Sequence, residues 1–180
     1  MEYIELSRRS GETCTFLIRR CQTDDFADIM ALQLSVQESL DDPELCMKME
    51  QAEISESLQF DYCLGAYAGD ELAAVTIMVV NRVSPRNYGS WLGYDDEKQR
   101  SCVSMDVTMV DPRYRGYGLQ KCFVAMREEE ARRLGATEAF VTISPDNTHS
   151  LRNFVSSGYE LVETKPLYGD IIRSILKKDI

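Results

Sequence analysis

The stretch Val110-Asp111-Pro112-Arg113-Tyr114-Arg115-Gly116-Tyr117-Gly118-Leu119-Gln120-Lys121 carries the clearest signal in this chain. The preceding run, 101–110, is rich in β-branched residues and predicts a strand. After the two glycines, an apolar stripe with a 3.6-residue spacing predicts a helix that ends at Gly135. The stretch is therefore a tight turn between a strand and a helix.

This glycine turn suits a pyrophosphate. Glycines let main-chain N–H groups converge without Cβ atoms, and a helix N-terminus adds the positive end of a dipole. Arg113, Arg115 and Lys121 bring cationic side chains to the turn. An ordinary strand-to-helix connection is the alternative interpretation. The turn is neither a P-loop, because no Gly-Lys-Ser/Thr follows, nor a dinucleotide GxGxxG, because Lys121 occupies the third glycine position.

Outward from the turn, the pattern alternates strands with few helices, which indicates an α+β layered fold. Upstream we expect a strand at 13–20, helices at 23–40 and 44–58, a hairpin of 62–68 with 71–80, and a long connection over 81–100. Downstream we expect a strand at 137–143, a helix at 147–157, and strands at 159–163 and 169–177. In the long connection, Tyr88, Trp91 and Tyr94 either line a pocket or form a small satellite of the core.

The composition predicts one cytoplasmic domain. The chain has 180 residues, 44% of them hydrophobic, and a formal charge of −10. We expect a single domain over 1–180, in which 1–12 form an N-terminal extension. No secretory signal or membrane span is visible, and the charge argues against nucleic acid. Six dispersed cysteines and the single His149 predict reduced thiols and no metal site.

A second block, Asn147-Thr148-His149-Ser150-Leu151-Arg152-Asn153-Phe154-Val155-Ser156-Ser157-Gly158-Tyr159, adds specificity to the first. Together with Ile18-Arg19-Arg20 and Thr23-Asp24-Asp25, the two blocks resemble the GNAT N-acetyltransferases over most of residues 14 to 178. The resemblance implies the GNAT fold: a mixed, mostly antiparallel sheet with splayed parallel central strands and about four helices. It also implies acetyl-CoA as cosubstrate.

The resemblance implies where acetyl-CoA would bind. Backbone groups at the end of the central strand, at Thr108, Met109 and Val110, would pair with the pantetheine amides. The pyrophosphate would be held by the turn residues Arg115, Gly116, Tyr117, Gly118, Leu119, Gln120 and Lys121. Asn147 would bind the pantetheine arm, and an N-cap role is compatible with that. Gln120 departs from the family's usual Gly or Ala.

The same resemblance suggests catalytic residues. Asp106 is the only ionisable group on its face of the 101–110 strand, so it is the candidate base; a structurally hydrogen-bonded aspartate is the alternative. Phe154 replaces the tyrosine that protonates the departing thiolate in many members. The acid would then be Tyr159, Tyr168 or water, and the sequence does not choose among them.

Two functions follow from these features. The first is an enzyme that transfers an acetyl group from acetyl-CoA to a primary amine by direct attack in a ternary complex. The second is a catalytically silent acyl-CoA-binding module, suggested by Phe154 and Gln120; a structural or protein-interaction domain without a CoA site is a third reading. The acceptor's identity stays open between small molecules and peptides, and a homodimer is compatible with the family.

The net charge is concentrated in one region. Residues 24–71 hold 13 acidic residues and one basic residue, Lys48, so the rest of the chain is slightly positive. A solvated acidic face explains such a run. Where it borders a site, it would favour a cationic amine as acceptor while the glycine turn holds an anion.

Overall fold

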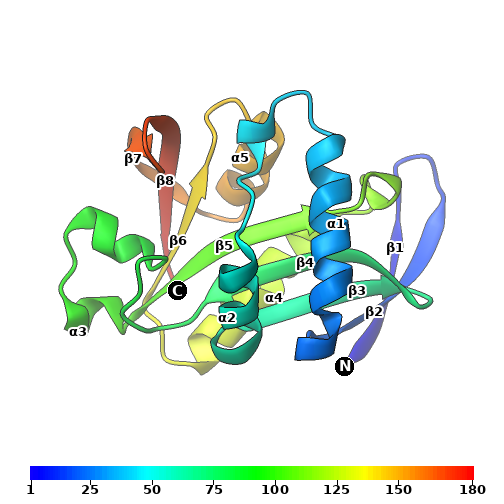
Figure 1. Cartoon of the computed structure of the whole chain (residues 1–180), viewed down its shortest axis with the longest axis horizontal. Helices are drawn as coiled ribbons and strands as arrows, with labels where there is room; N and C mark the ends of the chain where they lie inside the picture. Colours follow the sequence, from blue (N-terminus) through cyan, green and yellow to red (C-terminus); the bar gives the residue numbers. More distant parts are fainter. The chain divides into compact units, whose positions relative to one another are not determined.

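The computed structural model describes residues 1–180 as eight strands and five α-helices. The strands form one mixed sheet in the order β1-β2-β3-β4-β5-β6-β8-β7 (Figure 1). The chain divides into two compact units. The first comprises 1–43, 47–77 and 107–123, and the second comprises 44–46, 78–106 and 124–180. No helix is long and apolar enough to cross a membrane.

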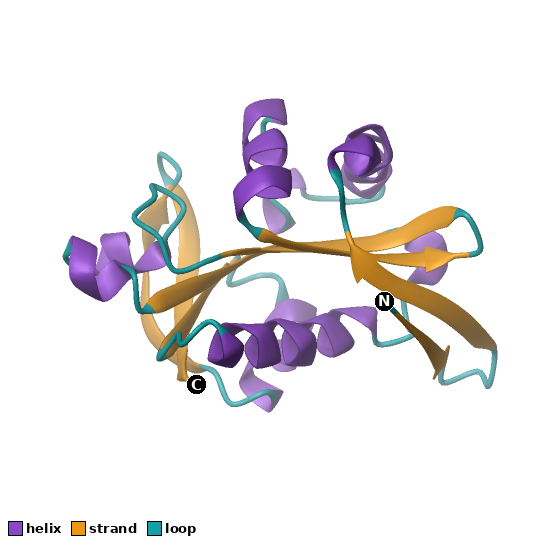
Figure 2. Cartoon of the chain, turned by 90° about the horizontal axis from the view of Figure 1, so that it is seen from below, coloured by secondary structure: helices purple, strands orange, loops and turns teal.

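The first unit is built on an antiparallel set of strands. Its elements are β1 (Glu2–Ser7), β2 (Thr13–Arg20), α1 (Phe26–Glu38), α2 (Gln51–Phe60), β3 (Tyr62–Ala68) and most of β4 (Glu71–Val79). Helices α1 and α2 contact each other, and α2 packs beside β3 (Figure 1). Figure 2 shows the strands in orange and the helices in purple, turned by 90° from the view of Figure 1. The predicted strand at 13–20 and the hairpin around Gly69 are confirmed.

Residues 2–7 are part of this sheet. We expected residues 1–12 to form an extension, yet β1 pairs antiparallel with β2 along its whole length, from Glu2 opposite Ile18 to Ser7 opposite Thr13. The connecting turn contains Arg8 and Gly11, and Gly11 N–H donates to the Arg8 carbonyl at 2.9 Å. The segment therefore ends in a tight, structured turn.

The second helix starts later than the predicted 44–58. Residues 43–45 form a short 3-10 turn and α2 begins only at Gln51. The buried Gln33 side chain explains the difference, because its amide bonds both the N–H and the carbonyl of Met49, at 2.9 and 3.0 Å. The Met49 N–H therefore cannot also donate to a carbonyl within a helix. Glu50 then caps α2 in a capping box with Glu53.

The second unit contains the elements around the parallel strands. They are α3 (Asp96–Gln99), the first half of β5 (Cys102–Val110), most of α4 (Leu119–Arg133), β6 (Glu138–Ile143), α5 (Thr148–Ser156), β7 (Glu160–Leu167) and β8 (Ile171–Asp179). Strand β6 runs parallel to β5 and antiparallel to β8. All the helices and strands predicted after the glycine turn are present; β7 is longer than expected, and β8 lies two residues later than expected.

The long connection 81–100 is ordered by one buried side chain. Asn87 donates to the carbonyls of Arg82 and Gln99 and accepts from Gly89 N–H. The connection then adds to a satellite core: Tyr88 packs with Cys102, Phe140 and Ile175, and Trp91, Leu92, Tyr94 and Leu167 pack against them. The satellite-core interpretation of these aromatic residues is therefore confirmed.

The central parallel strands are paired over only part of their length. Strand β5 pairs with β6 at three positions, from Cys102 opposite Glu138 to Ser104 opposite Phe140. Both strands continue, β5 to Val110 and β6 to Ile143. Met105 and Asp106, the next residues of β5 in this unit, therefore take no part in the β5–β6 ladder.

Candidate functional site

The turn before α4 is an open backbone site. Gly116 and Gly118 have φ values of 90° and 85°, which residues with a Cβ rarely adopt. A Cβ on Gly118 would meet no other atom within 4 Å. The first main-chain bond of α4 joins Cys122 N–H to the Gly118 carbonyl at 3.1 Å, so the N–H groups of Leu119 and Lys121 have no acceptor inside the helix. Open space, these amides and the helix dipole together fit an anion.

Arg8, from the β1–β2 turn, braces this glycine turn. Its guanidinium donates to the carbonyls of Arg113 and Arg115, the latter at 3.1 Å. It also lies 4.4 Å from the centre of the Tyr117 ring and pairs with Glu12 at 2.7 Å. Sequence reasoning missed Arg8 because it lies more than 100 residues from the turn. An arginine between two strands gives no local sign of such a contact.

The cationic side chains of the turn differ in whether they are already paired with groups of the protein. Arg113 is engaged: its guanidinium bonds Asp111, at 2.9 and 3.0 Å, and also Glu71. Arg113 therefore brings a cationic side chain to the turn, but Asp111 and Glu71 compensate its charge. Arg115 is exposed and donates to the Ser39 hydroxyl at 2.6 Å, and Lys121 is exposed.

Several of the other candidate cofactor-binding residues of this unit have buried side chains. The side chains of Tyr117, Leu119 and Met109 are buried, at 5%, 2% and 1% exposure, so only their backbone groups can serve a ligand. The Thr108 hydroxyl shares a hydrogen bond of 2.8 Å with that of Thr76. Gln120 and Val110 are partly exposed.

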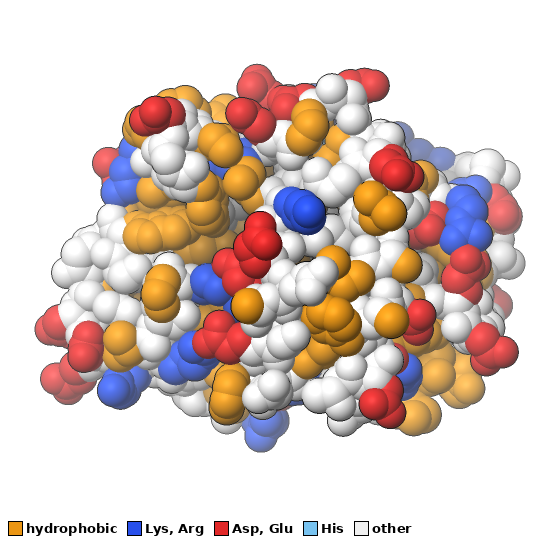
Figure 3. Space-filling model, in the orientation of Figure 1, with side chains coloured by type: hydrophobic (Ala, Val, Ile, Leu, Met, Phe, Trp, Pro, Cys, Tyr) orange, Lys and Arg blue, Asp and Glu red, His pale blue; other side chains and the backbone are white.

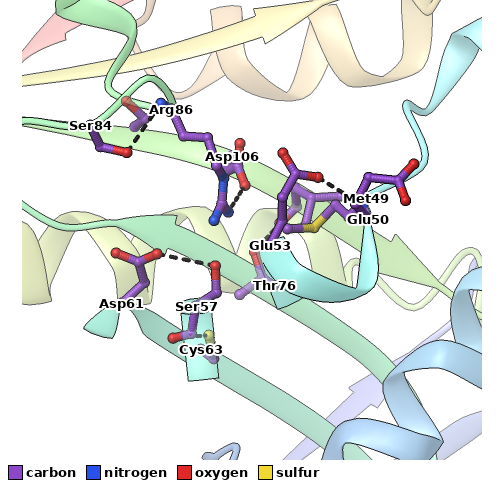
Figure 4. A network of polar contacts seen from close by, with 12 residues as sticks. Met49, Glu50, Glu53, Ser57, Asp61, Cys63, Thr76, Ser84, Arg86 and Asp106 are labelled. Atoms are coloured by element: carbon purple, nitrogen blue, oxygen red, sulfur yellow. Dashed lines mark hydrogen bonds and ion pairs between the residues drawn. The ribbon is translucent and has the colours of Figure 1, made fainter. Parts of the chain in front are cut away.

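Asp106 lies in a buried polar cluster of the second unit. Its carboxylate pairs with Arg86 and accepts a hydrogen bond from the Tyr88 hydroxyl at 2.8 Å. Figure 4 shows the Arg86 side chain reaching Asp106, while Arg86 N–H donates to the Ser84 hydroxyl at 3.2 Å. The side chains of Arg86 and Asp106 are each 12% exposed. The sequence pointed to Asp106 but not to its partners, which come from the long connection.

A chain of hydroxyl groups extends from Asp106 toward the surface. The Tyr168 hydroxyl, in the β7–β8 turn, lies 3.5 Å from that of Tyr88 and 3.3 Å from that of Thr142. Trp91 stacks on Tyr88 and meets Tyr168 edge-on. Burial raises the pKa of both tyrosines, and the Asp106 charge adds to this effect, so both phenols stay protonated near neutral pH. They can donate protons but do not carry charge.

Tyr168 is held in an uncommon backbone conformation. It is the one residue other than glycine with positive φ, at 51°, and it is 43% exposed. A tyrosine in this region costs roughly 1 kcal/mol or more, which its contacts with Trp91 and the hydroxyl chain can offset. Strain of this kind is found where side-chain placement matters.

Tyr159 occupies a different environment. It is 2% exposed, its ring meets Phe154 edge-on at 5.0 Å, and Lys178 lies 5.7 Å from the ring centre. Burial, with the charge of Glu128, raises its pKa. No chain of hydrogen bonds connects the Tyr159 hydroxyl to Asp106.

Asn147 is engaged at both ends of its amide. Its oxygen accepts from Ser150 N–H at 3.0 Å, which caps α5, and its nitrogen donates to the Leu45 carbonyl at 3.1 Å. The expected N-cap role is therefore confirmed. The expected contact with the pantetheine arm stays a prediction.

Cys21 and Cys102 are buried, protonated thiols rather than nucleophiles. Burial raises the pKa of Cys21 to about 12 and that of Cys102 to about 11. All six cysteines are free thiols. No group of three or more His, Cys, Asp or Glu side chains is arranged to hold a metal ion.

Surface charge is mixed on the face drawn in Figure 3, where acidic and basic side chains are interspersed. Acidic atoms stand out along its upper edge. In the acidic region 24–71, Asp41, Asp42 and Glu44 are exposed, whereas Asp25 is buried in a bidentate pair with Arg19. Much of the acidic run is therefore solvated or structurally paired.

Several solved structures are similar to this chain in fold. A GNAT-family acetyltransferase from Streptococcus pneumoniae is 16% identical, with a TM-score of 0.70 over 92% of this chain and 99% of that chain. One from Listeria monocytogenes is 14% identical, with a TM-score of 0.71 over 98% and 100%. The YncA protein of Salmonella typhimurium, solved with its cofactor acetyl-CoA, is 16% identical, with a TM-score of 0.67 over 91% and 93%.

No protein-family model matches the sequence, and no curated protein matches it significantly. The structural likeness extends over nearly the whole of each compared chain. This protein therefore has the α+β fold of the GNAT acetyltransferases, as its glycine turn and Asn-led helix implied.

Proposed function

We propose that this protein is an N-acetyltransferase that moves an acetyl group from acetyl-CoA to a primary amine by direct attack in a ternary complex. The observation that carries the proposal is the open glycine turn before α4, in a chain with the fold of acetyltransferases. Positive-φ glycines, first-turn amides and exposed Arg115 and Lys121 suit a pyrophosphate.

The residues present fit acetyl-CoA. Residues 115–121 would hold the pyrophosphate, mainly through their backbone N–H groups. The backbone of Thr108, Met109 and Val110, which lies beyond the β5–β6 ladder, would pair with the pantetheine amides as an added strand does. Asn147 would reach the pantetheine arm only by giving up its contact with Leu45.

Asp106 and the hydroxyl chain would handle the protons. Acetyl-CoA supplies an activated acyl group with a thiolate leaving group. As the amine nitrogen bonds to the acyl carbon and the C–S bond breaks, Asp106 accepts the amine proton. Tyr168 donates a proton to the thiolate, Tyr88 restores the proton of Tyr168, and protonated Asp106 restores that of Tyr88.

We favour Tyr168 over Tyr159 as the acid because of its surroundings. Tyr168 is partly exposed and adjoins the Tyr88 hydroxyl, whereas Tyr159 is 2% exposed beside Phe154. Water is the remaining alternative, since a thiolate leaves readily near neutral pH.

A silent acyl-CoA-binding module is the second candidate. This second candidate is favoured by Phe154, which is 2% exposed. It lies at the position where many GNAT enzymes have a tyrosine that protonates the thiolate. Calorimetry with acetyl-CoA, followed by release of CoA thiol with a panel of amines, separates the two. Binding with amine-dependent thiol release supports the enzyme, and binding with intact acetyl-CoA throughout supports the module. Absence of binding would overturn both.

A further inference from the structure

Arg173 is a buried arginine with an incomplete set of partners. It lies on β8, opposite Lys165 of β7, and is 2% exposed. Its Nη2 donates to the main-chain carbonyl of Glu44 at 2.6 Å. Its Nη1 is buried and makes no hydrogen bond.

No carboxylate compensates the charge of Arg173. The carboxylates of this unit that form ion pairs do so with other cations: Asp106 with Arg86, Glu138 with Lys177, Glu128 with Lys178, and Glu163 with Lys165. A buried guanidinium that meets only a carbonyl is costly unless an anion joins it. A ligand carboxylate would supply that anion and could take two parallel hydrogen bonds from the guanidinium.

Arg173 acts on the residues that we propose transfer the protons. Its positive charge acts on Tyr168, where it opposes the rise in pKa that burial causes. Tyr168 meets Trp91 and adjoins the hydroxyl of Tyr88, which bonds Asp106. On β8, Arg173 shares a strand face with Ile175, which packs with Tyr88, the hydrogen-bond partner of Asp106.

The segment that covers Arg173 can be displaced by a better acceptor. Residues 44–46 are held in part by two side-chain donors, Arg173 to the Glu44 carbonyl and Asn147 to the Leu45 carbonyl. A carboxylate carries a full negative charge and can accept two parallel hydrogen bonds from a guanidinium, whereas the Glu44 carbonyl accepts one from Arg173. A carboxylate that enters here would replace the Glu44 carbonyl.

We propose that Arg173 binds a carboxylate of the acceptor, so that the acceptor is an amine that also carries a carboxylate, as free amino acids do. This inference rests on the proposed acetyl transfer and names its substrate class. The acceptor's carboxylate meets Arg173 while its amino group faces Asp106. The amino group can still be cationic before it reacts.

Matched pairs of amines test the proposal. L-phenylalanine with phenethylamine, L-leucine with isopentylamine, and L-lysine with cadaverine differ by the carboxylate alone. Thiol release from acetyl-CoA is measured for each. We expect kcat/KM to be about 10- to 100-fold higher for the carboxylate member, as a charged hydrogen bond implies. Equal or better acetylation of the decarboxylated members overturns the proposal.

Variants identify the residue that makes the difference. Arg173→Gln should abolish the preference for carboxylates while leaving acetyl-CoA affinity unchanged, and Arg173→Lys should restore part of it. Arg152→Gln removes an exposed positive charge from α5 and serves as the matched control, with the preference retained. Retention of the preference in folded Arg173→Gln overturns the proposal, and so does its loss in Arg152→Gln.

A binding readout covers the case in which no amine is acetylated. Trp91 is the only tryptophan, and it contacts Tyr168, so its fluorescence reports on this site. Each amine is titrated in the presence of CoA. A saturable change with L-amino acids, absent in Arg173→Gln, supports the carboxylate site. Lack of any saturable change overturns it, whereas failure of acetyl-CoA to bind overturns the proposed function instead.

Discussion

The glycine turn before α4 and the cluster around Asp106 are built in opposite ways. The turn is local: its conformation comes from Gly116 and Gly118, and its proposed binding groups are backbone amides. The cluster is assembled from side chains on the 81–100 connection, β5, β6 and the β7–β8 turn. A backbone site tolerates most side-chain changes but no change of backbone conformation, whereas a side-chain cluster depends on each hydroxyl and charge.

The largest expected effect concerns Asp106. Asp106→Asn should lower kcat roughly 10³-fold, since it removes the proposed base, with little change in acetyl-CoA affinity. Because Asp106 also pairs with Arg86, Arg86→Met is the comparison. If Asp106 serves only as the partner of Arg86, the two variants will lose activity equally. Melting temperatures show whether each variant is folded.

The next effect concerns the glycine turn. Gly118→Ala should weaken acetyl-CoA binding about 10- to 100-fold in calorimetry, because the φ of 85° is unfavourable and backbone donors to the phosphates shift. Gly135→Ala is the control at the other end of α4: Gly135 also has positive φ, 76°, and open space around a Cβ. Equal losses of affinity in both variants would mean that only general backbone strain is being measured.

A smaller effect separates the two tyrosines. Tyr168→Phe should lower kcat roughly 10-fold, and Tyr159→Phe should leave it nearly unchanged. The pKa of Tyr168 is raised, so its phenol donates below that value and loses its proton only as the pH rises through it. Wild-type kcat should therefore show no decline from this group between pH 7 and 9. The reverse ranking of the two variants would favour Tyr159 as the acid.

The smallest effect tests the support of the turn. Arg8→Ala should weaken acetyl-CoA binding about 5-fold, since the carbonyls of Arg113 and Arg115 lose a shared donor. We expect kcat at saturating acetyl-CoA to stay the same, because Arg8 contacts the turn rather than the reacting groups. Arg9→Ala, at the exposed neighbouring residue, is the control and should bind normally.

A feature could be predicted from the sequence when the residues that determine it lie close together along the chain. The strands, helices and glycine turn around Gly118 could be read from spacing, because their conformations depend on neighbouring residues. The start of α2 could not, because Gln33 binds the backbone of Met49 from 16 residues away. Asp106 could be singled out by its position on a strand, but its pairing with Arg86 could not.

The sequence by itself determined the order of elements, the turn that needs glycine and the resemblance to acetyltransferases, since these depend on local backbone preferences and periodicity. Only the tertiary structure decided that Arg113 is neutralised, that Arg8 braces the turn and that Arg173 is buried without a carboxylate. The physical reason is that charge compensation depends on which side chains meet in space. In this fold, the hydrogen-bonding groups that meet a charged side chain come from strands and turns up to 129 residues away.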